Sequence, residues 1–124
     1  MRTTPDPLLE LADNEIFVFG SNLGGRHGAG AAKYAFEHFG AQYGRGHGLV
    51  GHSYAFPTLD QNLKQISSKL LSRFALTFYH TAADLPSLTF MLTKVGCGLA
   101  GYSEAEMKWY FRFAPENVIR PEGW

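Results

Sequence analysis

The sequence predicts an α/β protein in which helices cover a layered sheet. Short apolar runs rich in β-forming residues alternate along the chain with segments whose apolar residues recur every three or four positions. A length of 124 residues suits one domain, and 45% hydrophobic with 18% charged residues suits a packed core. We therefore expect one domain over residues 1–124, with an irregular lead-in over residues 1–14.

Each element of the first half follows from a local pattern. Residues 8–12 have the composition of a short helical turn, and the apolar run 16–19 is typical of a strand buried on both faces. Apolar residues at helical spacing over 29–39, with Gly40 as a stop, predict a helix. A short strand is expected over 53–56, ended by Pro57.

The second half continues the alternation. Five residues form the apolar stripe of a long helix that starts near Asp60 as a candidate N-cap: Leu63, Ile66, Leu70, Phe74 and Phe78. A buried strand follows at 88–93. Ser103 and Glu106 have the spacing of a capping box that opens the next helix, and 117–120 resembles a last short strand.

Charge and composition exclude several classes of protein. Eleven basic and eleven acidic residues cancel, which disfavours bulk attraction to nucleic acid or to anionic membranes. No apolar run reaches the roughly 20 residues that span a bilayer, and the N-terminal residues lack a signal peptide. The single cysteine, Cys97, excludes an internal disulfide and a four-cysteine zinc site. These features predict a cytoplasmic domain.

Glycine is concentrated in two places. Ten of the fourteen glycines lie between Gly20 and Gly51, and three more lie between Gly96 and Gly101, so the clusters suggest ligand loops rather than general flexibility. The alternative is that both clusters are turns between helices and strands.

Both clusters follow predicted strands. Over residues 20–32 the chain passes from a strand through glycines into a helix of small residues, an arrangement that suits phosphate binding by backbone N–H groups. The segment lacks the Gly-Lys-Ser/Thr of a P-loop, and Lys33 stands where a Rossmann loop needs glycine or alanine. Residues 93–102 repeat the passage from strand to helix. The two loops are expected to face one cleft, with Tyr102 available to stack on a sugar or base.

Four segments together resemble the macrodomain family, in order and over nearly the whole chain: Phe19-Gly20-Ser21-Asn22, residues 26–32, residues 54–60 and Gly96-Cys97-Gly98-Leu99-Ala100-Gly101. They are most similar to the small branch that includes ADP-ribose-1″-phosphate phosphatases and terminal ADP-ribose protein glycohydrolases, with phage and bacterial relatives. The resemblance implies a compact three-layer α/β/α fold with a central mixed sheet. It also implies an ADP-ribose site at the carboxyl ends of the strands. We expect no cofactor, and no metal because no histidine belongs to an H-E-x-x-H motif or is joined by a pair of cysteines.

The resemblance assigns roles to single residues. Asn22 matches an asparagine that contacts the distal ribose, and three residues match the first diphosphate loop: Gly28, Ala29 and Gly30. Four others match the second phosphate loop: Gly98, Leu99, Ala100 and Gly101. Gly96, which precedes them, is also a candidate ligand-binding residue. Tyr102 stands where an aromatic residue flanks the distal ribose. Two positions depart from the glycohydrolase pattern, because Leu59 replaces a lysine and Ala100 an acidic residue.

His27 is the titratable side chain that the sequence places within the first phosphate loop. Histidine titrates near neutrality, so His27 is the candidate general acid or base, with Asn22 positioning the ribose; the alternative is a histidine that points to solvent.

Three function classes remain. The first is a hydrolase of a 1″-phosphate or ester-linked ADP-ribose. The second is a non-catalytic module for ADP-ribose, for an ADP-ribosylated protein or for a related NAD-derived signal. The third, less expected, is a nucleic-acid-binding domain.

Overall fold

The computed structural model describes residues 2–124, so Met1, which the expected domain and lead-in include, lies outside the described residues. The elements in chain order are β1 (Glu15–Asn22), α1 (Gly30–His38), β2 (Gly48–Val50), β3 (Ser53–Leu59), α2 (Ser68–Asp84), β4 (Thr89–Leu92), α3 (Glu104–Tyr110) and β5 (Val118–Ile119). The α/β alternation predicted from the sequence is confirmed.

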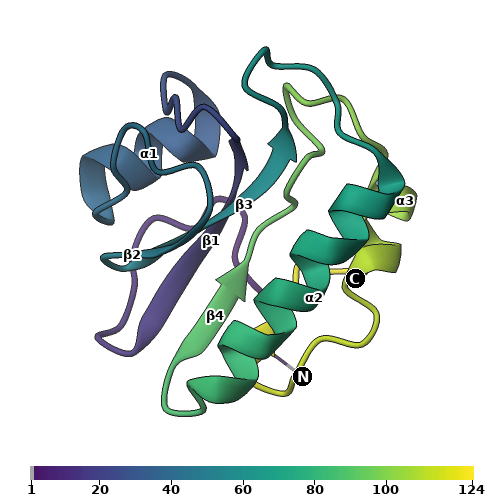
Figure 1. Cartoon of the computed structure of the whole chain (residues 1–124). Helices are drawn as coiled ribbons and strands as arrows, with labels where there is room; N and C mark the ends of the chain where they lie inside the picture. The colour runs from purple at the N-terminus through teal and green to yellow at the C-terminus, as the bar shows by residue number, and fades with distance from the viewer. Residues whose placement is uncertain (1) are drawn as a thin grey trace.

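The strands form one mixed sheet of five strands in the order β2-β3-β1-β4-β5 (Figure 1). β1 lies at the centre and pairs in parallel with both β3 and β4. β5 extends the parallel part, whereas β2 pairs antiparallel with β3. The carboxyl ends of β1, β3 and β4 therefore meet at one edge of the sheet.

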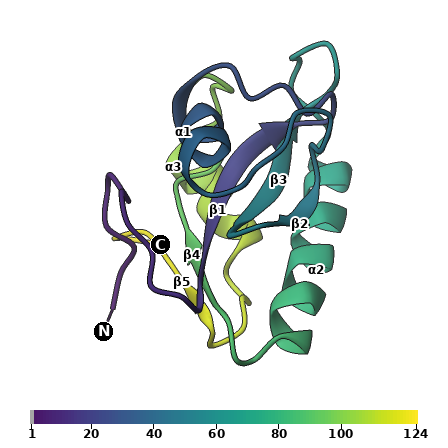
Figure 2. The same cartoon turned by 90° about the vertical axis from the view of Figure 1, so that its left-hand side faces the viewer.

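Helices cover both faces of the sheet, with α1 on one side and α2 on the other (Figure 2). Successive residues of β1 alternate between the two cores, as the period of a strand requires. Ile16 and Val18 pack in the core under α2 and α3, and Phe17 and Phe19 in the core under α1. This alternation explains why the run 16–19 is continuously apolar.

β3 departs from its predicted extent. The strand continues through Pro57, which pairs with Ser21 of β1. β2 pairs with β3 only as far as Ala55, so the absent N–H of Pro57 interrupts no bond to β2. β2 itself has three residues, too few to give an alternating pattern, and was not predicted.

The helices also differ in part from the prediction. α2 starts at Ser68, and the hydroxyl of Ser67 caps it by accepting a hydrogen bond from the Leu70 N–H. Asp60 is therefore not the N-cap. The Ser103 cap of α3 is confirmed, because its hydroxyl accepts from the Glu106 N–H at 3.1 Å. Residues 8–12 form no helical turn.

The N-terminal segment instead packs against the end of the chain. The Thr4 N–H donates to the Arg120 carbonyl oxygen at 2.8 Å, and the Thr4 hydroxyl to that of Ile119 at 3.0 Å. Leu8 is buried in the core under α1. Among residues 2–124, none of the helices combines the length and apolar character needed to cross a membrane.

Candidate functional site

A cleft of about 790 Å³ lies at the carboxyl ends of β1, β3 and β4. Residues 28–32 at the start of α1 form one side of it, and the N-terminal segment 4–9 forms another. Tyr34 of α1 joins these two sides, because its hydroxyl donates to the Leu9 carbonyl oxygen at 3.0 Å. The loop 93–100 after β4 supplies further lining, as expected for a ligand site in an α/β sheet.

The first predicted phosphate loop lines this cleft. Its three residues Gly28, Ala29 and Gly30 are exposed and precede or open α1. No side chain caps this helix and no acidic residue occupies its first turn. Its first backbone N–H groups are therefore without a side-chain partner and form the positive end of the helix dipole. A Cβ atom at Gly28 would meet nothing within 4 Å, whereas Gly30 has φ +59° and needs glycine for its backbone.

The second predicted loop is divided between structural and exposed positions. Gly96 is required by the fold, because its φ is +79° and a Cβ atom there would lie 2.9 Å from the Tyr102 ring. Gly98 has no such constraint, since a Cβ atom would meet nothing within 4 Å. Leu99 is 87% exposed and lines the cleft together with Ala100. Gly101, predicted as a ligand contact, has φ +82° and lies outside the cleft lining.

Asn22 lines the cleft and also ties together its own loop. Its amide nitrogen donates to the Arg26 carbonyl oxygen at 2.8 Å, and its amide oxygen accepts from the Arg26 N–H at 3.0 Å. The side chain is thus held in one orientation with 8% of the residue exposed. A contact with a ribose would use the remaining hydrogen and lone pair of this amide.

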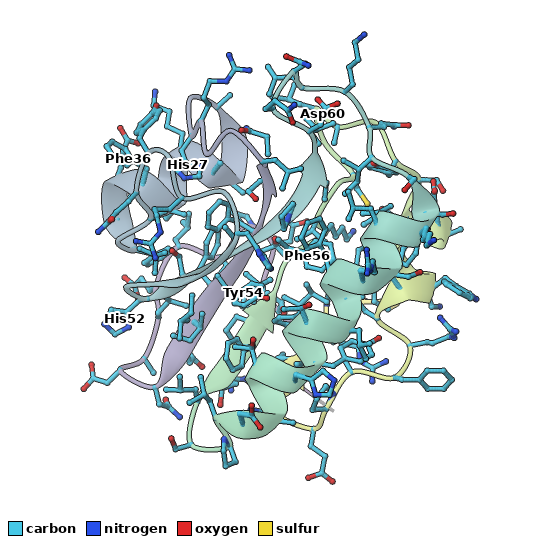
Figure 3. All side chains as sticks on the ribbon, in the orientation of Figure 1. His27, Phe36, His52, Tyr54, Phe56 and Asp60 are labelled. Carbon is cyan, nitrogen blue, oxygen red and sulfur yellow. The ribbon has the colours of Figure 1, made fainter. Side chains whose placement is uncertain are left out.

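His27 does not lie in the cleft. The residue is fully buried, and its ring packs edge-on against Phe19 and beside Tyr43. Nε2 lies 2.8 Å from the Gln42 carbonyl oxygen and donates to it, because a carbonyl oxygen can only accept, whereas Nδ1 is buried with no hydrogen-bond partner. Figure 3 shows His27 beside α1. Its burial corrects both sequence interpretations, the solvent-facing residue and the general acid or base of the cleft.

Tyr102 is likewise a core residue and not a ligand-stacking one. It is 7% exposed, lies outside the cleft lining, and its hydroxyl donates to the Thr58 carbonyl oxygen at 2.7 Å. The same hydroxyl accepts from the Ile66 N–H at 3.0 Å. Burial raises the pKa of this phenol, which therefore stays protonated as a donor.

Three charged side chains line the cleft: Asp6, Arg26 and Lys94. Arg26 and Lys94 belong to the two segments, 20–32 and 93–102, that were expected to face it, whereas Asp6 lies in the lead-in. Arg26 is fixed by a 2.8 Å bond from its guanidinium to the Gln61 carbonyl oxygen. Lys94 lies with its Nζ atom 3.3 Å from a carboxylate oxygen of Glu104. Lys94 lies two residues after β4, and its place at the cleft agrees with the convergence of loops after parallel strands.

Within residues 2–124, no group of three or more His, Cys, Asp or Glu side chains is placed to hold a metal ion. Cys97 is half-buried outside the cleft lining, and burial raises the pKa of its thiol.

Comparison with known proteins found no matching family model, no matching curated protein and no matching solved structure.

Proposed function

We propose that the chain is a small macrodomain-like module whose cleft binds ADP-ribose or an ADP-ribose derivative. The motifs of the sequence suggest this ligand. The cleft supports the proposal because it lies at the sheet edge where the two glycine loops meet.

Gly28 and Gly98 carry the proposal. Neither has a positive φ, and at neither would a Cβ atom contact any other part of the protein. The fold therefore accepts a side chain at both positions, although both positions line the cleft. Glycine at such places is explained by a ligand that approaches the backbone closely.

The charges of the cleft suit a diphosphate. Arg26 and Lys94 supply two cations, and the uncapped start of α1 supplies free N–H groups and the positive end of the helix dipole. Asp6, on the N-terminal segment, is the one carboxylate among the described residues that line the cleft, so the two cations outnumber it. Since His27 is enclosed, these groups favour a binding role over hydrolysis through that residue.

Calorimetric titration tests the proposal. We expect ADP-ribose to bind more tightly than AMP or NAD, and Lys94→Ala to weaken ADP-ribose binding much more than adenosine binding. Lys69→Ala is the matched control for loss of one positive charge, because Lys69 is an exposed residue of α2 that lies outside the cleft lining. Incubation of the same protein with 1″-phosphate and ester-linked ADP-ribose then separates a binder from a hydrolase. Equal heats for AMP and ADP-ribose would remove the role of the distal ribose.

A further inference from the structure

Leu63 has a backbone conformation that leucine rarely adopts. Its φ is +62°, the only positive φ at a residue other than glycine within residues 2–124. Left-handed backbone costs an L-residue with a Cβ atom about 1–2 kcal/mol, and glycine or asparagine is the usual occupant. The backbone at Leu63 is therefore strained, and glycine or asparagine would form the same turn with less strain.

The turn around Leu63 holds this conformation firmly. The Asp60 carboxylate accepts hydrogen bonds from the N–H groups of Asn62 and Lys64 at 2.8 and 3.0 Å. The Leu63 N–H donates to the Asp60 carbonyl oxygen at 3.1 Å, and Leu59 pairs with Gln65 across the turn. Figure 3 shows Asp60 in this loop, directly after β3. Residues 59–65 thus form a closed turn that presents the Leu63 side chain in a fixed direction.

Leu63 meets no core that would explain its side chain. It is 50% exposed and lines the cleft, as does Leu99, which is 87% exposed. The two loops that carry these leucines are joined, because the Gln65 amide donates to the Ala100 carbonyl oxygen at 2.8 Å. Two exposed leucines therefore border one part of the cleft, which we call the leucine rim.

A strained backbone at an exposed apolar residue suggests that the residue serves a contact with another molecule and not the stability of the fold. Strained conformations gather at ligand clamps, where the surrounding structure holds them in place. We propose that the leucine rim is a ligand contact that covers the uncharged surface of the bound molecule, so that Leu63 and Leu99 determine affinity for ligands longer than a mononucleotide. This inference rests on the proposed ADP-ribose site. It adds that carbon surface of the ligand, and not its phosphates, is bound by this part of the cleft.

Leu63→Asn is the decisive variant, because a ligand contact and a structural residue predict different results. Asparagine tolerates the left-handed backbone, so the thermal unfolding midpoint without ligand should stay the same or rise. The affinity for ADP-ribose should fall by about 3- to 10-fold, which corresponds to losing part of one buried leucine side chain. Leu63→Met keeps an apolar side chain and should retain the affinity within about twofold.

Two further variants complete the calorimetric and thermal experiment. Leu99→Ser should weaken ADP-ribose binding by a similar factor, whereas Leu76→Ser, on the exposed face of α2 at 57% exposure, should leave it unchanged. AMP binding should change less than ADP-ribose binding in both rim variants.

Each outcome decides the matter. Unchanged ADP-ribose affinity in Leu63→Asn and Leu99→Ser, with a wild type that binds, overturns the rim and leaves the proposed function standing. A lower unfolding midpoint for Leu63→Asn shows that the leucine serves the fold and overturns the inference. A wild type that fails to bind ADP-ribose overturns the proposed function and the rim with it.

Discussion

The hydroxyl of Tyr102 donates a 2.7 Å hydrogen bond to the carbonyl oxygen of Thr58, at the point where β3 leaves the sheet. The same hydroxyl accepts from the Ile66 N–H, so one side chain ties the loop 96–102 to both ends of the turn before α2. The loop 96–102 and the turn 59–65 are thereby held together by a side chain that lies in the core.

Tyr102→Phe should therefore affect stability more than binding. Removing the hydroxyl leaves two backbone groups without this partner, and we expect the free energy of unfolding to fall by about 1–3 kcal/mol. Affinity for ADP-ribose should stay within a few-fold, because the side chain lies outside the cleft lining. Urea unfolding and calorimetry measure the two quantities. A large loss of affinity with unchanged stability would restore the ligand-stacking role.

Glycine substitutions separate ligand approach from backbone need. Gly28→Val and Gly98→Val should abolish ADP-ribose binding while the unfolding midpoint stays near that of the wild type, since neither position is sterically crowded. Gly96→Ala should lower the thermal unfolding midpoint, because the new methyl group would clash with Tyr102 and because a φ of +79° is unfavourable for alanine. Gly96→Ala thus serves as the control that shows how a glycine substitution with a structural cost lowers the unfolding midpoint, against which Gly28→Val and Gly98→Val are compared. If Gly28→Val binds normally, the close approach of a diphosphate to this loop is wrong.

His27→Ala is expected to act through packing. The fully buried ring fills space between Phe19 and Tyr43, and its removal should cost about 2–5 kcal/mol of unfolding free energy, as for other large core residues. His27→Phe replaces the volume but leaves the Gln42 carbonyl oxygen without its ring donor, so it should recover part of this loss. Denaturant unfolding checks both variants. Wild-type stability in His27→Ala, together with loss of turnover on an ADP-ribose ester, would return the residue to catalysis.

Acid should weaken the contacts by which the Glu15 carboxylate holds Arg2 and Ala12 of the N-terminal segment. The Ala12 N–H donates to the Glu15 carboxylate at 2.8 Å and Arg2 pairs with the same group; these contacts lower the pKa of Glu15. A lowered folded-state pKa gives stability that is complete above the unfolded-state pKa of about 4.3 and is lost as the pH falls through the folded-state value.

Glu15→Gln should remove this pH dependence in part. Between about pH 5 and pH 2, the unfolding free energy of the variant should fall less steeply than that of the wild type. Arg2→Ala, which removes only the cationic partner, should give an intermediate slope. Chemical unfolding across this pH range is the measurement, and identical slopes in all three proteins would exclude Glu15 as a contributor.

Local patterns predicted the parts of this protein that depend on neighbouring residues. The strand at 16–19, the helix ended by Gly40 and the Ser103 cap follow from spacing and side-chain chemistry within a few positions. Asp60 was assigned to a helix N-cap because its carboxylate accepts backbone N–H groups, and it does so, but in a turn.

The remaining features depend on contacts between distant residues. His27 is buried because residues 42–43 fold back over it, and nothing in the glycine loop itself indicates that. The N-terminal side of the cleft arises from Thr4 bonding to residues 119–120. Loop position after a strand predicted Gly28, Gly98 and Leu99 at the cleft, whereas it could not distinguish an inward-facing Tyr102 from an outward-facing one.

The pairing of Thr4 with the residues beside β5 also sets an order of events during synthesis. Chains emerge from the ribosome N-terminus first, and residues 119–120 leave it more than a hundred positions after Thr4. β1, α1 and β3 can assemble earlier, and Leu8 and Leu9 can then contact this part of the chain, but Thr4 has no hydrogen-bond partner until residues 119–120 emerge. A nascent chain therefore completes the N-terminal wall of its cleft late, and shortened translation products that stop before β5 would lack the contacts that hold Thr4 in place.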